Sequence, residues 1–127
     1  MPTIGDIVYY WIKWETENKE IPPWGFWDYG EPACMACTRW SESWDHPKTI
    51  RAKWNSTGLE RCHVIPRYLG GTDEVSNLVL MCSKCHQNQP DDLDPEITYR
   101  YMRERSRLSH ITFAEAMEYM KLNGITL

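Results

Sequence analysis

The sequence contains no apolar run of the roughly 18 residues that a membrane-spanning helix needs. Its first residues, MPTIGDIVYYWIKWETENKE, also lack the basic start and apolar stretch of a secretory signal. Phenylalanine occurs only twice, and 14 basic residues face 18 acidic ones, which gives a net charge of −4. These absences predict a soluble, cytoplasmic protein without a membrane partner. The acidic balance argues against nucleic-acid binding by the whole surface, because phosphate affinity comes largely from lysine and arginine.

Two features offset these absences. The 127 residues are enough for one domain with a core of its own, and all seven tryptophans lie between residues 11 and 54, so we expect the first half to supply aromatic packing. Basic residues gather between positions 48 and 84, where they outnumber Glu60, Asp73 and Glu74; they are Lys48, Arg51, Lys53, Arg61, Arg67 and Lys84. A local basic face and scattered solvated charge both remain open.

Four of the five cysteines form two pairs of equal spacing, Cys34-x-x-Cys37 and Cys82-x-x-Cys85. Disulfides are disfavoured in a reducing compartment, and two such pairs supply the four thiolates of a tetrahedral structural zinc site. The string CSKCH also matches a haem-attachment pattern, but that leaves CMAC unexplained. A thioredoxin-like redox pair is disfavoured because neither pair lies in a strand-to-helix βαβ pattern. We therefore predict one structural Zn²⁺, with disulfides or free thiols as the alternative.

Hydrophobic periodicity gives a coarse order of elements. An amphipathic stripe behind a capping box at Thr3 and Asp6 predicts a helix over residues 4–18, and PPWG and GEP mark a loop after it. LERCHVI (59–65) and NLVLMC (77–82) predict two strands joined by a long loop that contains two glycines. SKCHQNQ predicts a short helix that Pro90 ends, and a capped helix is expected over 113–122, begun by Thr112 and ended by Asn123 and Gly124.

The stretch LERCHVIPRYLGGTDEVSNLVLMCSKCH resembles the HNH endonuclease motif, in the subgroup that carries zinc knuckles. The resemblance implies an α+β fold: a small ββα-metal core organised by a four-cysteine zinc site, with flanking helices at both ends. It implies one nuclease domain over 1–127, made of an N-terminal helix and Trp-rich loop (1–33), the knuckle-bearing core (34–90) and C-terminal helices (91–127).

The three namesake positions of the motif fall on His63, Asn77 and His86. The resemblance implies that His63 is the general base, that His86 holds the catalytic divalent ion, and that Asn77 braces the loop. From the residues alone, a buried core histidine is the default interpretation of His63, and His86 could support the knuckle from outside the zinc shell. Gly70 and Gly71 are expected to permit positive φ in the loop.

The chain departs from the motif at Cys62, where the family usually has a carboxylate or a second histidine. As a ligand, this thiolate would favour zinc, nickel or cobalt. As a packing residue, which we favour, it would leave Mg²⁺ or Mn²⁺ as the expected catalytic ion. Glu60, two residues earlier on the same strand face, is a weaker candidate for the missing ligand.

DNA is the substrate that the resemblance implies, in homing, restriction, phage packaging or defence, so that a phage or mobile element is a compatible source. We expect Arg61, Arg67 and Lys84 to contact phosphates rather than bases. Arg100, Arg103 and Arg107 share a predicted helix face, which is either solvated or a further contact. The alternative function is a zinc-organised nucleic-acid-binding domain with a degenerate, inactive site.

Overall fold

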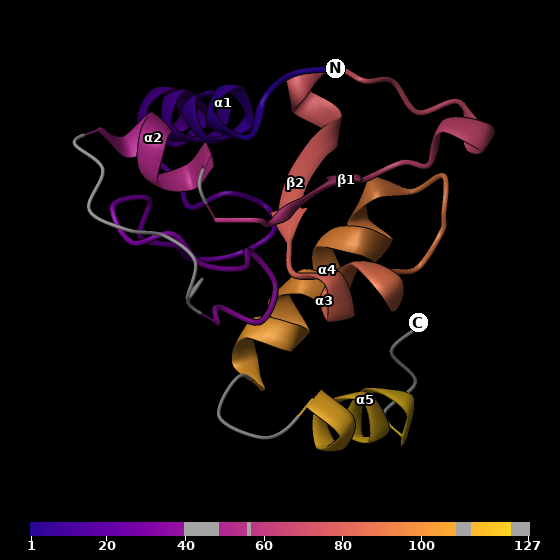
Figure 1. Cartoon of the computed structure of the whole chain (residues 1–127). Helices are drawn as coiled ribbons and strands as arrows, with labels where there is room; N and C mark the ends of the chain where they lie inside the picture. The colour runs from indigo at the N-terminus through magenta and orange to yellow at the C-terminus, as the bar shows by residue number, and fades with distance from the viewer. Residues whose placement is uncertain (40–48, 56, 109–112, 123–127) are drawn as a thin grey trace.

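A two-stranded antiparallel sheet lies in the middle of the chain, between helices from both ends of the sequence (Figure 1). The computed structural model describes residues 1–39, 49–55, 57–108 and 113–122. Strand β1 (Glu60–His63) pairs with β2 (Leu78–Met81) in a register that sets His63 opposite Leu78. All four residues of β2 are buried, because helices cover what an isolated hairpin would expose.

Helix α1 (Ile4–Asn18) covers one side of this sheet. Its capping box forms as the sequence predicts: the Asp6 N–H donates to the Thr3 hydroxyl, and the Thr3 N–H donates to the Asp6 carboxylate. Trp11 is buried and its indole Nε1 donates to the Leu78 carbonyl at 2.9 Å, which ties α1 to β2. The predicted bounds of this helix are confirmed.

The short helix α2 (Ile50–Asn55) packs on α1 and was not predicted. Its Arg51 guanidinium lies 2.7 Å from the Asp6 carboxylate and lowers the pKa of that carboxyl to about 2. Trp54 is buried, and its indole donates to the Tyr29 carbonyl. So few residues form a helix only with such tertiary support.

The tryptophans make a continuous aromatic core, as the sequence predicts. Trp24 lies 5.9 Å from Trp11 and 5.1 Å from Trp27 between ring centroids, and Trp27 lies 5.8 Å from Trp54. The rings meet mostly edge to face, the arrangement that their quadrupoles favour. Trp40 and Trp44 lie outside the described residues.

Helix α3 (Ser83–Gln87) follows β2 directly and carries Cys85 and His86, as predicted. Helix α4 (Pro95–Arg107) supports it, since the Tyr101 hydroxyl donates to the Cys85 carbonyl at 2.7 Å. The Thr98 hydroxyl of α4 also donates to the Val64 carbonyl just after β1. These two bonds fix α3 relative to the end of β1, where His63 lies.

Helix α5 (Phe113–Leu122) matches the last predicted helix, whereas its expected ends at Thr112, Asn123 and Gly124 lie outside the described residues. The α+β class, with a small sheet and helices before and after it, is confirmed. Both strands are shorter than predicted, because the chain leaves the ladder at Val64 and enters it only after a 3-10 turn, Val75–Asn77. Within the part of the chain that is described, every helix is too short or too polar to cross a bilayer.

Candidate functional site

The two cysteine pairs meet at the junction of β2 and α3. The Sγ atoms of Cys34, Cys37, Cys82 and Cys85 all lie within 4.8 Å of one another. The Sγ atoms of Cys37 and Cys82 are 3.9 Å apart, close to the separation of about 3.8 Å that tetrahedral Zn–S bonds of about 2.3 Å imply. All of these thiols are free of disulfides. Donor type, number and spacing therefore fit one structural Zn²⁺.

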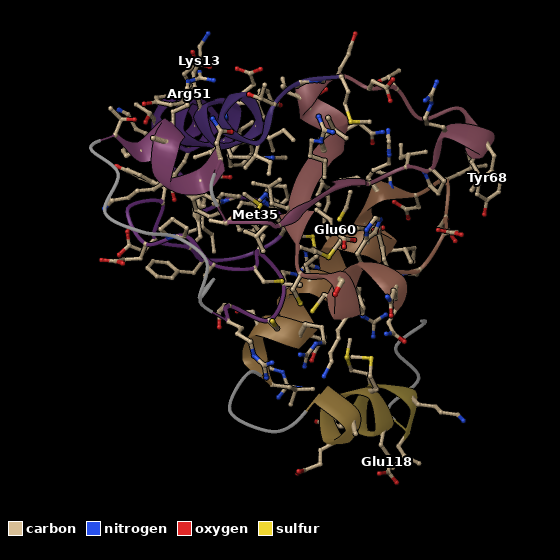
Figure 2. All side chains as sticks on the ribbon, viewed as in Figure 1. Lys13, Met35, Arg51, Glu60, Tyr68 and Glu118 are labelled. Carbon is tan, nitrogen blue, oxygen red and sulfur yellow. The ribbon has the colours of Figure 1, made fainter. Side chains whose placement is uncertain are left out.

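Backbone contacts hold the first knuckle in place. The Thr38 N–H donates to the Cys34 carbonyl, and Thr38 takes a left-handed φ of 64° that closes the turn. The Met35 N–H donates to the Leu80 carbonyl at 2.9 Å, so this loop lies along the edge of β2 (Figure 2). The Cys82 N–H donates to Cys34 Sγ at 3.3 Å, which links the two knuckles directly. A metal bound at this point would join segments far apart in sequence.

The fifth cysteine, Cys62, lies apart from the four-cysteine cluster and faces the core. Its side chain is fully buried, and its thiol donates to the Glu60 carbonyl at 3.3 Å. Burial raises the pKa of this thiol well above its ordinary range. A neutral, hydrogen-bonded thiol of this kind packs as a small apolar group.

His63 and His86 line one open cavity of about 400 Å³, although they come from β1 and α3. The remaining residues of its wall are Pro66, Arg67, Tyr68, Gln89 and Asp91. The Gln89 amide donates to the His63 carbonyl at 2.6 Å, and Tyr68 lies exposed at the edge of the molecule (Figure 2). The structure thus brings together the two histidines that the sequence singles out.

Each histidine contacts one carboxylate. His63 Nε2 lies 2.7 Å from Asp73 Oδ1, and His86 Nδ1 lies 2.7 Å from Glu60 Oε1. The hydrogen bond with His63 lowers the pKa of the Asp73 carboxyl below its usual value. Sequence reasoning missed Asp73, and it ranked Glu60 below Cys62. No spacing rule would have revealed either contact, because both depend on how the loop and α3 fold back on β1.

Asn77 fastens the loop between the strands. Its Oδ1 accepts from the Ile65 N–H at 2.9 Å, and its Nδ2 donates to the carbonyls of Ile65 and Thr72 at 3.0 and 2.9 Å. The side chain is buried, so these three bonds satisfy the amide and hold both ends of the loop.

The two loop glycines serve different ends. Gly70 has a φ of 99°, as expected, but Gly71 does not have positive φ, so that expectation was wrong for Gly71. Gly71 instead allows close approach: a Cβ there would stand 1.8 Å from the Ile65 carbonyl oxygen and 2.9 Å from Asn77 Nδ2. The Ile65 backbone cannot easily move away from such a Cβ, because Asn77 bonds to both its N–H and its carbonyl.

Gly71→Ala is therefore expected to destabilise the protein by on the order of 3 kcal/mol, at the upper end of the cost of overpacking. Urea unfolding measures the loss. Gly30→Ala is the matched control, because its Cβ would meet only the flexible Asp28 carboxylate at 3.3 Å. Equal stability of the two variants would contradict the close-approach explanation.

The candidate DNA contacts are dispersed. Arg67 lies in the cavity wall and its Nε is 3.7 Å from Asp73 Oδ1, whereas Arg61 donates to the Pro2 carbonyl outside the cavity. Lys84 is exposed on α3. In α4, Arg103 pairs with Glu96 and Arg107 with Glu104, while Arg100 is exposed. Of these residues, only Arg67 lines the same cavity as the two histidines.

Comparison with known families points to the same segment. Residues 51–102 match the family model described as HNH endonuclease, and this range contains most of α2, the β1–loop–β2 hairpin, α3 and α4 as far as Met102. The match covers less than half of the chain and leaves out the first cysteine pair. Neither the curated proteins nor the solved structures contain a significant match.

Proposed function

We propose that the HNH endonuclease domain at residues 51–102 hydrolyses DNA phosphodiester bonds in a reaction that requires a divalent cation, with His63 as the general base. The observation that supports this most directly is the shared cavity, where His63, His86 and Arg67 meet from three different segments. A core histidine would be enclosed, whereas the His63 side chain keeps about 20% of its surface exposed.

The chain's own groups suit the proton transfer. Histidine is the side chain most often used to take a proton from water in a transition state, and His63 offers that group at the cavity. Arg67 at the cavity wall carries the positive charge that a phosphate requires. Asn77 and Gly71 keep the loop that carries Arg67 in a fixed relation to His63. His63 as the base and Arg67 as the anion-binding group are therefore positioned before the substrate binds.

A catalytic cation is expected at Glu60 and His86. His86 Nδ1 and Glu60 Oε1 lie 2.7 Å apart in a hydrogen bond that a bound ion would replace, and neighbouring ligands of an octahedral ion at about 2.1 Å stand about 3 Å apart. When bound there, a divalent ion would stabilise the negative charge that develops on the phosphate and the leaving oxygen. Since Glu60 offers oxygen and the Cys62 thiol points into the core, Mg²⁺ or Mn²⁺ fits this donor set better than a softer ion.

Incubation with supercoiled plasmid tests the proposal. The purified protein is expected to nick or linearise DNA in Mg²⁺ or Mn²⁺, and less in Ni²⁺ or Zn²⁺, while His63→Ala leaves the plasmid supercoiled. DNA binding without cleavage under every metal would instead support the alternative, a zinc-organised binding domain with an inactive site.

Glu60→Gln should weaken Mn²⁺ binding to the zinc-loaded protein by at least about tenfold, because a carboxylate beside a metal-binding histidine is lost. Calorimetric titration with Mn²⁺ measures this affinity. Cys62→Ala should leave the Mn²⁺ affinity unchanged and lower stability by about 1–2 kcal/mol, the cost of a small core cavity. The reverse result, with affinity lost in Cys62→Ala and kept in Glu60→Gln, would assign the ion to the cysteine.

A further inference from the structure

The carboxylate of Asp73 lies directly beside the candidate base. Its Oδ1 lies 2.7 Å from Nε2 of His63, and the two residues are ten positions apart, with Asp73 on the β1–β2 loop. The side chain of Asp73 keeps about 38% of its surface exposed. Since this hydrogen bond lowers the pKa of Asp73, the carboxyl is ionised at neutral pH and can only accept a proton.

The Asp73 carboxylate, as a hydrogen-bond acceptor at Nε2 of His63, determines which ring nitrogen carries the proton. In a neutral imidazole one nitrogen carries the proton and the other accepts one, so a donor Nε2–H leaves Nδ1 as the basic atom. The carboxylate also stabilises the imidazolium that forms when Nδ1 is protonated. Both effects favour proton transfer at Nδ1 without any contact between Asp73 and the substrate.

The loop holds Asp73 in place on both sides. The Asn77 amide donates to the carbonyl of Thr72, the residue just before Asp73, at 2.9 Å. Arg67 Nε lies 3.7 Å from the same Oδ1 that faces His63. The carboxylate thus joins the base to the arginine of the cavity wall.

We propose that Asp73 is the positioning residue of the reaction, which holds His63 with Nε2–H toward the loop and Nδ1 as the atom that deprotonates water. This inference rests on the proposed nuclease function. In the step, a proton passes from water to Nδ1 while the water oxygen bonds to phosphorus. The bond from phosphorus to the leaving oxygen breaks, and that oxygen gains a proton from solvent.

Steady-state kinetics of Asp73→Asn, Asp73→Ala and Asp73→Glu test the inference. We expect kcat to fall about 10- to 100-fold in Asp73→Ala, as for other groups that orient a reactive imidazole. KM for DNA and the Mn²⁺ affinity should stay within about twofold, because Asp73 binds neither in this scheme. Asp73→Asn should lose part of the rate, and Asp73→Glu should recover part of it.

Glu74→Gln is the matched control, since it removes one negative charge from the adjacent, exposed residue. A wild-type kcat in Glu74→Gln would show that the contact with His63 matters rather than the net charge of the loop. A kcat in Asp73→Ala equal to that of Glu74→Gln would overturn the inference. So would a loss of Mn²⁺ affinity in Asp73→Ala, which would make Asp73 an ion ligand instead.

Proton NMR of the imidazole N–H groups reads the contact without any cleavage. At about pH 8, where free imidazole is neutral, the wild type should show a slowly exchanging Nε2–H signal that disappears in both His63→Ala and Asp73→Ala. Persistence of this signal in Asp73→Ala would overturn the inference. A wild type that shows the signal and cuts no DNA would instead count against the proposed nuclease function alone.

Discussion

Cys85→Ser is expected to leave the protein unfolded and without zinc. The four Sγ atoms lie together where the first knuckle meets the junction of β2 and α3, and none of the five cysteines forms a disulfide that could replace a bound ion. Structural zinc contributes about 10–16 kcal/mol at neutral pH, whereas a domain of this size is stable by only about 5–15 kcal/mol. Metal analysis should find one zinc ion per wild-type chain, and circular dichroism should show the loss of fold in the variant.

Cys62→Ser is the matched control for this experiment. It makes the same chemical change at another fully buried cysteine, one whose thiol bonds to the Glu60 carbonyl outside the cluster. We expect it to fold and to retain zinc, with a stability loss of about 1–2 kcal/mol from burying a hydroxyl. A folded, zinc-free Cys85→Ser protein, or a disulfide between Cys34 and Cys37 in the wild type, would refute the structural role of the metal.

Local sequence signals predicted a helix correctly where the groups that stabilise the helix lie within the same segment. Helix α1 has its cap at Thr3 and its apolar stripe within one segment, and both of its predicted ends are correct. Helix α2 was missed because burial of Trp54 and packing on α1 stabilise it. The structure shows a cap, since the Ala52 N–H donates to the Thr49 hydroxyl, but a cap alone does not make six residues a helix.

In the candidate site too, the sequence predicted the residues of the motif but not the contacts that depend on the fold. Fixed spacings in the motif singled out His63, Asn77 and His86, and the fold brings both histidines to one cavity. Their carboxylate partners, Asp73 and Glu60, were beyond such reasoning, because a loop conformation and a helix docking decide which acid reaches which imidazole. Gly71 was misjudged for a related reason: the requirement comes from the Ile65 carbonyl beside it, not from its own φ.

His63→Ala should lower the cleavage rate by about 10²- to 10⁴-fold, the usual contribution of a general base. Zinc content, thermal stability and DNA affinity should stay close to wild type, because the imidazole acts in the transition state and adds little to ground-state binding. Single-turnover cleavage of labelled DNA measures the rate, and fluorescence anisotropy measures the affinity.

Two further variants separate the roles of the neighbouring groups. His86→Ala should lose cleavage together with calorimetric binding of Mn²⁺, since it removes an expected ion ligand. Arg67→Ala should weaken DNA binding and reduce its salt dependence by about one counterion, while Mn²⁺ affinity is kept. The three changes surround one cavity, so a structural role shared by all of them would give parallel losses of thermal stability. A loss of rate alone in one variant, of Mn²⁺ affinity in the second and of DNA affinity in the third would indicate a catalytic site. A packing defect would lower the stability of all three variants without separating these properties.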